Sequence, residues 1–140
     1  MNNEFGFTLD AAASAENAKC KNFYTEADDA LQKSWETEGA VFCNPPYGRK
    51  LGKWVEKARQ ESEKHHKNVV LLIPARTDTS YFHEQIFGHA QVRFVRGRLK
   101  FELEDGTPGG AAPFASAIIV YKGDRNEKEK DAKLLQKKCN

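Results

Sequence analysis

The chain has 140 residues, and 22 lysines and arginines against 20 aspartates and glutamates leave a formal charge of +2, which identifies no partner. Hydrophobic residues make up 39% of the chain, enough for the core of one domain. The longest clean apolar run, residues 69–73, is far too short to cross a bilayer. Three widely spaced cysteines, with no Cys-x-x-Cys or His-Glu-x-x-His motif, argue against a disulfide framework and a zinc site. We therefore expect no bound metal, no membrane contact and a location in a reducing cytosol.

The first half of the chain predicts two strands, each followed by polar residues. Residues 5–9 form a short β-type run that ends at Asp10, and the small residues 11–15 follow it. A polar stretch then leads to Asp28 and Asp29, which precede a short helical pattern. The next apolar run, residues 40–43, stops at two consecutive prolines, because proline cannot continue a β-ladder.

The second half predicts one long helix, a short helix and three further strands. Apolar residues recur at i, i+3, i+4 and i+7 between residues 50 and 67, which indicates an amphipathic helix. The continuous apolar run 69–73 is typical of a strand buried on both faces. A short helix is expected before Gly88, and residues 115–121 form a last strand. Between them, Val95, Leu99 and Phe101 alternate with Arg96, Arg98 and Lys100, which indicates a two-faced strand or hairpin arm.

Strands that alternate with helices predict an α/β sheet, which binds its ligands outside the carboxyl ends of its strands. We expect one domain over residues 1–121, with a Gly/Pro-rich loop at residues 102–112. Residues 122–140 are rich in charge and are expected to form a frayed helix or a disordered extension.

The tetrad Asn44-Pro45-Pro46-Tyr47, which we call the reactive cup, directly follows a predicted strand. Its asparagine offers an amide oxygen, its prolines fix the backbone so that the Pro45 carbonyl can serve as a second acceptor, and its tyrosine offers a flat face for stacking. Two acceptors match the two N–H bonds of an exocyclic amine and leave the nitrogen lone pair free to attack a methyl group. The alternative is a plain Pro-Pro turn closed by a tyrosine.

The reactive cup resembles the Asn/Asp-Pro-Pro-Tyr/Phe motif of S-adenosylmethionine-dependent amino methyltransferases. Most of the chain, residues 4–121, is similar to the phage-type, Dam-like DNA N6-adenine methyltransferases in the order and spacing of its motifs. The matching stretches are residues 4–10, 17–20, 28–35, 42–48, 54–57, 72–78, 93–101 and 112–114.

The resemblance implies a Rossmann-like class I methyltransferase sheet, mostly parallel with an antiparallel C-terminal hairpin, in a minimal single domain. S-adenosylmethionine would lie over the end of the first strand, near Asp10, Ala11 and Ala13. The family tends to have an Asp-x-Cys-Ala run here, where this chain has alanines. Asp28 or Asp29 resembles a second acidic position for the cofactor, and a helix N-cap is the alternative role.

Two basic groups are candidates for contact with DNA phosphates. Arg49, Lys50 and Lys53 follow the reactive cup, where a solvated helix start is the alternative. Arg96, Arg98 and Lys100, interleaved with aromatic residues, suit a nucleic-acid strand, where a charged edge strand is the alternative.

The resulting hypothesis is a site-specific enzyme of a bacterial or phage-infected cytoplasm that methylates adenine N6 in double-stranded DNA. Family members usually have a Trp-x-Thr-Pro segment before the first strand, whereas here that strand begins almost at Met1. One alternative is therefore a truncated, inactive relative that only binds nucleic acid. Another is an amino methyltransferase that acts on RNA or on protein glutamine.

Overall fold

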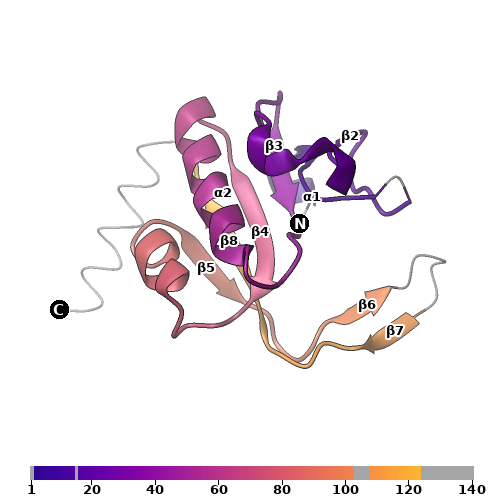
Figure 1. Cartoon of the computed structure of the whole chain (residues 1–140), viewed down its shortest axis with the longest axis vertical. Helices are drawn as coiled ribbons and strands as arrows, with labels where there is room; N and C mark the ends of the chain where they lie inside the picture. Colours follow the sequence, from indigo (N-terminus) through magenta and orange to yellow (C-terminus); the bar gives the residue numbers. More distant parts are fainter. Residues whose placement is uncertain (1, 15, 103–107, 124–140) are drawn as a thin grey trace.

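The computed structural model describes residues 2–14, 16–102 and 108–123, and the description below concerns this part of the chain. Six strands form one sheet in the order β2-β1-β3-β4-β8-β5, and β6 and β7 form a separate pair (Figure 1). The elements, in chain order, are α1 (Asn2–Phe5), β1 (Phe7–Asp10), β2 (Asn22–Phe23), the single 3-10 turns η1 (Glu26–Asp28) and η2 (Ala30–Gln32), β3 (Ala40–Cys43), α2 (Leu51–His65), β4 (Val69–Pro74), the short π-helix η3 (Phe82–Ile86), β5 (Gln91–Phe94), β6 (Lys100–Glu102), β7 (Pro108–Ala111) and β8 (Ser116–Tyr121).

The sheet is mostly parallel and ends in an antiparallel pair, which confirms the predicted fold class. β2, β1, β3 and β4 run parallel, and β8 lies antiparallel between β4 and β5. Val70 and Leu71 of β4 are both fully buried, because this central strand has covered faces on both sides. The carboxyl ends of β1, β3, β4 and β5 lie at one edge of the sheet, which we call the carboxyl edge.

The helix α2 and the short helix η3 cover one face of the sheet. Leu51, Trp54, Val55 and Ala58 of α2 are buried, as their spacing predicts, and they pack in one core with alternate residues of the strands. Burial of this apolar stripe is the main reason that the helix forms, since charged residues occupy most of its remaining surface.

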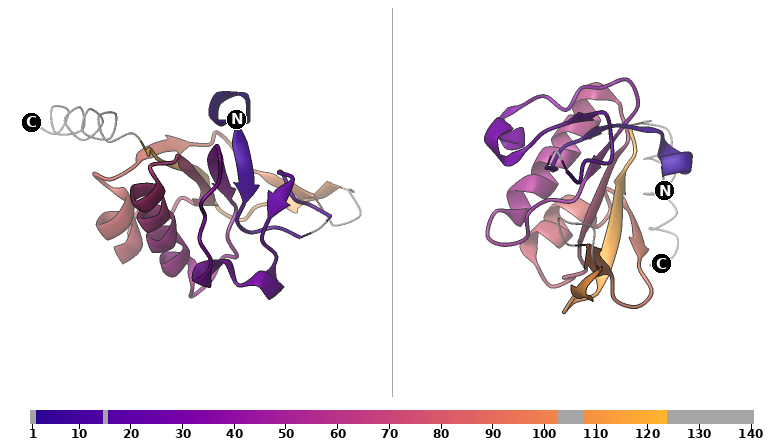
Figure 2. Two further views of the ribbon diagram at one scale, coloured as in Figure 1. Left: turned by 90° about the horizontal axis from the view of Figure 1, so that it is seen from above. Right: turned by 90° about the vertical axis from the view of Figure 1, so that its right-hand side faces the viewer.

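The opposite face of the sheet carries α1 (Figure 2) and a row of aromatic rings. Phe5 stacks on Phe7 with ring centroids 5.6 Å apart, and Phe7 packs against Phe42 of β3 at 5.4 Å. The guanidinium of Arg93 on β5 donates two hydrogen bonds, of 2.6 and 2.7 Å, to the carboxylate of Glu4. These contacts connect α1 to β5, the outermost strand on the other side of the sheet.

β6 and β7 form an arm that projects from the carboxyl edge (Figure 1). We define the arm as the described residues of 95–115. One segment of the arm follows β5 and the other leads into β8, and hydrogen bonds join the two segments between the sheet and the β6–β7 pair. The Val95 N–H donates to the Ser116 carbonyl at 3.0 Å, and the Ala112 N–H donates to the Leu99 carbonyl at 2.7 Å.

Of the two alternatives for residues 95–101, a two-faced strand or a hairpin arm, the structure has the hairpin arm, because Gly97 has a φ of 77° and bends the chain between β5 and β6. The alternation of side chains is broken there, so Arg96, Arg98 and Lys100 are not aligned on one strand face. The expected loop at residues 102–112 contains β7, whose Pro-Gly-Gly-Ala sequence forms a strand through its pairing with β6.

The segment between β1 and β3 also differs from expectation. β2 lies within the stretch that the sequence marks as polar, and it forms by pairing with β1. The short helix expected after Asp28 and Asp29 is replaced by the single turns η1 and η2. No helix in the described part of the chain is long and apolar enough to cross a membrane. The predicted C-terminal tail lies, from residue 124 on, outside the described residues.

The two leucines at the centre of β4 give a matched test of this packing. Leu71 is fully buried against the α2 face, whereas its neighbour Leu72 is half-buried on the other face. We expect Leu71→Ala to lower the free energy of unfolding by about 2–5 kcal/mol in urea denaturation, with a clearly smaller loss for Leu72→Ala. Equal losses would contradict the assignment of the main core to the α2 face.

Candidate functional site

The reactive cup lies at the carboxyl edge, in the connection from β3 to α2. Asn44 and Pro46 are exposed, whereas Pro45 is buried and Tyr47 is half-buried. Gly48 has a φ of 142°, a conformation that favours glycine, and it turns the chain from the cup into α2. The cup is therefore a fixed loop whose asparagine faces solvent.

The phenol of Tyr47 holds Asn44 in place. Its oxygen lies 2.9 Å from Asn44 Oδ1 and 3.2 Å from the Leu72 carbonyl oxygen. One phenol hydrogen cannot serve both acceptors fully, and a half-turn of the Asn44 amide resolves this by making the phenol oxygen an acceptor towards Asn44 and a donor towards Leu72. In that arrangement Asn44 Nδ2 donates to the phenol, the phenol donates to Leu72, and Asn44 Oδ1 is free to accept from a ligand.

The environment of Tyr47 keeps its phenol protonated at neutral pH. Burial raises the pKa of Tyr47 to about 12, and the nearby Cys43 thiol acts in the same direction. The tyrosine ring meets the ring of Phe114 edge-on, with centroids 5.5 Å apart and planes at 76°. Tyr47 is thus a hydrogen-bond donor in the cup, and its stacking on a ligand stays a prediction.

On the β1 side of the cup, Asp10 organises the loop that follows β1. Asp10 is only 2% exposed, and its carboxylate accepts hydrogen bonds from the backbone N–H of Lys19 at 2.9 Å and of Ala12 at 3.3 Å. Burial raises the pKa of Asp10, and these two hydrogen bonds act against that rise. The Asp10 carboxylate therefore fixes the loop through these two backbone hydrogen bonds. A direct contact of Asp10 with a cofactor stays a prediction.

The same loop carries a hydroxyl that sequence reasoning did not single out. The N–H of Ala11 donates to the Phe42 carbonyl and that of Ala13 to the Tyr24 carbonyl, both at 2.9 Å, so the loop lies along the ends of β3 and β2. Ser14 Oγ is buried and has no hydrogen-bond partner among the described residues. A buried hydroxyl without a partner is costly, and a ligand oxygen or nitrogen would satisfy it.

Asp28 and Asp29 lie just beyond the end of β2 and play different parts. The Asp28 carboxylate accepts hydrogen bonds from the Thr25 N–H at 2.7 Å and the Thr25 hydroxyl at 3.0 Å, which lower its pKa. Asp28 is the last residue of η1 and bonds back to Thr25, the N-cap residue, so its role here is to close the turn and it is not itself the N-cap. Asp29 is exposed with a left-handed φ of 53°, and no described residue bonds its carboxylate. Asp29 is the better candidate for a ligand contact.

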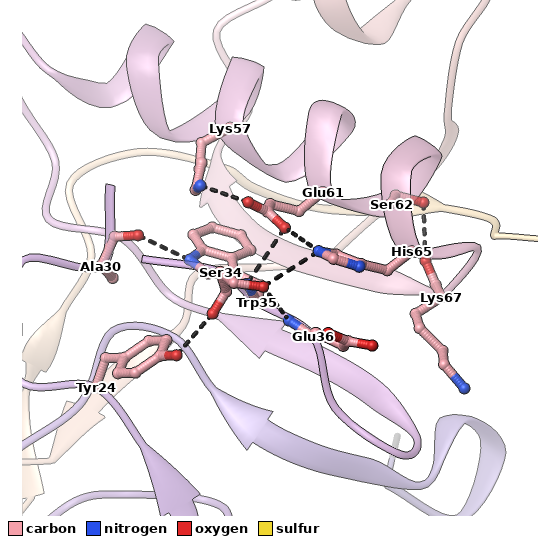
Figure 3. Close-up of polar contacts among 10 residues, drawn as sticks. All are labelled: Tyr24, Ala30, Ser34, Trp35, Glu36, Lys57, Glu61, Ser62, His65 and Lys67. Atoms are coloured by element: carbon pink, nitrogen blue, oxygen red, sulfur yellow. Dashed lines mark hydrogen bonds and ion pairs between the residues drawn. The ribbon is translucent and has the colours of Figure 1, made fainter. Parts of the chain in front are cut away.

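A polar cluster centred on Glu61 of α2 fastens this acidic loop to the domain (Figure 3). The buried Glu61 carboxylate accepts hydrogen bonds from Lys57 Nζ and, at 3.2 Å, from the Trp35 N–H, and His65 Nε2 lies 2.8 Å from it as an ion-pair partner. The indole N–H of Trp35 donates to the Ala30 carbonyl at 2.9 Å. The cluster holds the segment that bears Asp28 and Asp29 against the helix.

The basic residues predicted to contact DNA all lie near the carboxyl edge and are exposed. Arg49, Lys50 and Lys53 surround the start of α2, which has no acidic residue in its first turn and no side-chain cap. Cations at a helix N-terminus oppose the helix dipole, so these residues do not stabilise the start of α2. Their contact with DNA stays a prediction. Arg96 and Arg98 lie at the bend of the arm, and Lys100 begins β6.

Compared with known families, the sequence matches one family model over most of the chain. The model of the family described as DNA N-6-adenine-methyltransferase (Dam) matches residues 1–134. The chain belongs to the Dam family. It is 33% identical over 98 residues to a protein of Escherichia phage T1 named DNA N-6-adenine-methyltransferase, which covers 70% of this chain and 40% of that protein. It is 36% identical over 76 residues to a protein of that name in Haemophilus phage HP1, which covers 54% of this chain and 43% of that protein.

This Dam-family chain also places two residues beside the cup to which sequence reasoning gave no role. Arg76 follows β4 and Phe114 precedes β8, and the guanidinium carbon of Arg76 lies 5.9 Å from the centre of the Phe114 ring. A long-range pairing of two strand ends brings them together, and only their positions next to strand ends could have indicated it. Among the described residues, no group of three His, Cys, Asp or Glu side chains could hold a metal.

The Glu61 cluster predicts a pH-dependent stability. Burial raises the pKa of Glu61, but the bonds from Lys57 and Trp35 and the charge of His65 outweigh it, so the pKa lies below its usual value of 4.5. A lowered pKa stabilises the fold above pH 4.5, and this contribution is lost as the pH falls through the folded-state pKa. We expect Glu61→Gln to cost about 1.5–3 kcal/mol at pH 7, measured by urea denaturation, and less at pH 3.5.

Glu63 is the matched control on the same helix. Its side chain is 47% exposed and pairs with Arg59, so Glu63→Gln should cost less than about 1 kcal/mol at both pH values. A cost for Glu61→Gln that does not change between the two pH values would contradict the assigned charge pairing.

Proposed function

We propose that this chain transfers a methyl group from S-adenosylmethionine to N6 of adenine at specific sites in double-stranded DNA. The observation that carries the proposal is the exposed Asn44, held by Tyr47 at the carboxyl edge of a Dam-family sheet. The chain spans 40% and 43% of the two phage relatives, so activity and substrate are inferred from the site. DNA as substrate also favours a cytoplasmic setting.

The residues on the β1 side fit the cofactor by their chemistry. Ala11, Ala13 and the unpartnered Ser14 hydroxyl form a loop of small residues that a ligand can approach closely, and Asp29 offers a carboxylate for ribose hydroxyls. S-adenosylmethionine supplies an electrophilic methyl group when bound. The Asp10 carboxylate keeps the loop in shape through the Lys19 and Ala12 N–H groups.

The cup positions the nucleophile without a strong base. The flipped adenine donates its two amine N–H bonds to Asn44 Oδ1 and the Pro45 carbonyl, which keeps the nitrogen lone pair localised and directed out of the cup. Tyr47 fixes the Asn44 amide through its protonated phenol, and Pro46 stiffens the turn. Both basic groups then face the DNA backbone beside the flipped base.

The cup is tested by three substitutions assayed for methyl transfer and for cofactor binding. Asn44→Ala removes an acceptor and should lower turnover by about 10²–10³-fold while cofactor affinity, measured by calorimetry, changes little. Asn44→Asp keeps an acceptor oxygen at this place and should lose less. Tyr47→Phe keeps the ring but releases the asparagine, so it should lower turnover with little change in DNA affinity. Wild-type turnover of Asn44→Ala would exclude the cup as the amine site.

The DNA face is tested by the salt dependence of duplex binding. Each phosphate contact contributes about 0.9 to the slope of log K against log salt concentration. Replacing Arg96, Arg98 and Lys100 together by alanine should reduce that slope by up to about 2.7, with cofactor binding kept. The corresponding triple change of Arg49, Lys50 and Lys53 tests the other group. A slope unaffected by either triple change would assign both groups to solvated surface.

A further inference from the structure

Arg76 and Phe114 occupy one cross-strand position beyond the end of the β4–β8 ladder. The ladder pairs Pro74 with Ser116, and the next residue is tied by a hydrogen bond of 2.8 Å from the Ala75 N–H to the Ala115 carbonyl. Continuing that antiparallel register places Arg76 opposite Phe114, where side chains meet. The backbone of the sheet therefore sets their contact, although neither residue belongs to a strand.

The contact forms one end of a row that begins in the reactive cup. Tyr47 meets Phe114 edge-on at 5.5 Å, and Phe114 in turn lies 5.9 Å from the guanidinium carbon of Arg76. The latter distance is within the range of a cation–π contact. Phe114 is half-buried between its two neighbours, whereas Arg76 is exposed to solvent. A charge is thus held at a fixed place next to the cup.

The backbone of Arg76 is also fixed, while its charge stays available. The Arg76 carbonyl accepts a hydrogen bond of 2.8 Å from the Thr79 hydroxyl, and the Arg76 N–H donates to the Pro74 carbonyl at 3.0 Å. No carboxylate in the described part of the chain pairs with its guanidinium. A cation–π contact uses the charge but not the N–H donors, so these remain free to bind an anion.

The position of Arg76 next to the sheet indicates which anion its guanidinium binds. The predicted cofactor loop follows β1, on the other side of β3, whereas Arg76 lies where β4 meets β8 and where the basic arm departs. We propose that Arg76, held over Phe114, binds a backbone phosphate of the nucleic-acid strand whose base enters the reactive cup. The inference rests on the proposed function and adds a residue to it, with Phe114 as the positioning residue that links the phosphate site to Tyr47.

The first test measures binding of duplex DNA that lacks adenine methylation, as a function of salt. Arg76→Ala should reduce the slope of log K against log salt concentration by about 0.9, and Arg76→Lys should restore it because a lysine also binds phosphate. Lys64→Ala is the matched control, since Lys64 is an exposed cation at the opposite end of α2 and should not change the slope. An unchanged slope for Arg76→Ala would overturn the proposal.

The second test locates the phosphate. Once the methylated adenine has been mapped, single phosphates around it are replaced by neutral methylphosphonates, and kcat/KM is measured for wild type and for Arg76→Ala. We expect one replacement next to the target to lower the wild-type kcat/KM by about tenfold and to leave Arg76→Ala unaffected. Equal losses for both proteins at every position would overturn the assignment.

Phe114→Leu gives a readout that separates positioning from simple packing. It should keep the salt slope, since the phosphate and Arg76 remain, but should lower kcat/KM on DNA because Arg76 and Tyr47 lose their common contact. A lower slope with unchanged kcat/KM would contradict the role of Phe114. If the wild-type protein bound DNA with the Arg76-dependent slope but transferred no methyl group to it, the proposed function would fail while the phosphate site stood.

Discussion

The early end of β3 is the constraint on which the candidate site depends. β3 pairs with β4 only as far as Cys43 and Leu71, because Pro45 and Pro46 cannot continue the ladder, whereas β4 runs on to Pro74. The carbonyl of Leu72, just past the last pair, accepts the phenol of Tyr47 instead of a β3 partner. That bond places Tyr47 beside Asn44, so the prolines that stop the strand also organise the reactive cup.

The parallel register then gathers the remaining groups around the cup. Because β1, β3, β4 and β5 end at one edge, the Asp10 loop lies on one side of the cup and the basic arm on the other. The two sides differ in character. The β1 side offers small residues, the Ser14 hydroxyl and carboxylates, and the β4–β8 side offers Phe114 and cations. This division suits a small ligand on one side and a phosphate chain on the other.

Much of this fold is predictable from local patterns, and the site only partly so. The spacing of Leu51, Trp54 and Val55 predicts α2, and the apolar run ended by Pro74 predicts β4, since both signals arise from burial of nearby residues. The bend at Gly97 and the strand β7 depend on which segments pair with each other, and such pairing leaves no periodic pattern in the sequence. For the same reason the Trp35–Glu61 bond and the Arg76–Phe114 contact become visible only in three dimensions.

The identity of the methylated atom tests the central claim most directly. The protein is incubated with S-adenosylmethionine carrying a labelled methyl group and with duplex DNA, and the DNA is then digested to nucleosides and separated. The account predicts that the label is recovered in N6-methyldeoxyadenosine. Label found only in added RNA or in protein glutamine would mean that the substrate is RNA or protein and would contradict the assignment to DNA. If DNA were bound but no acceptor received the label, an enzymatic role would be contradicted.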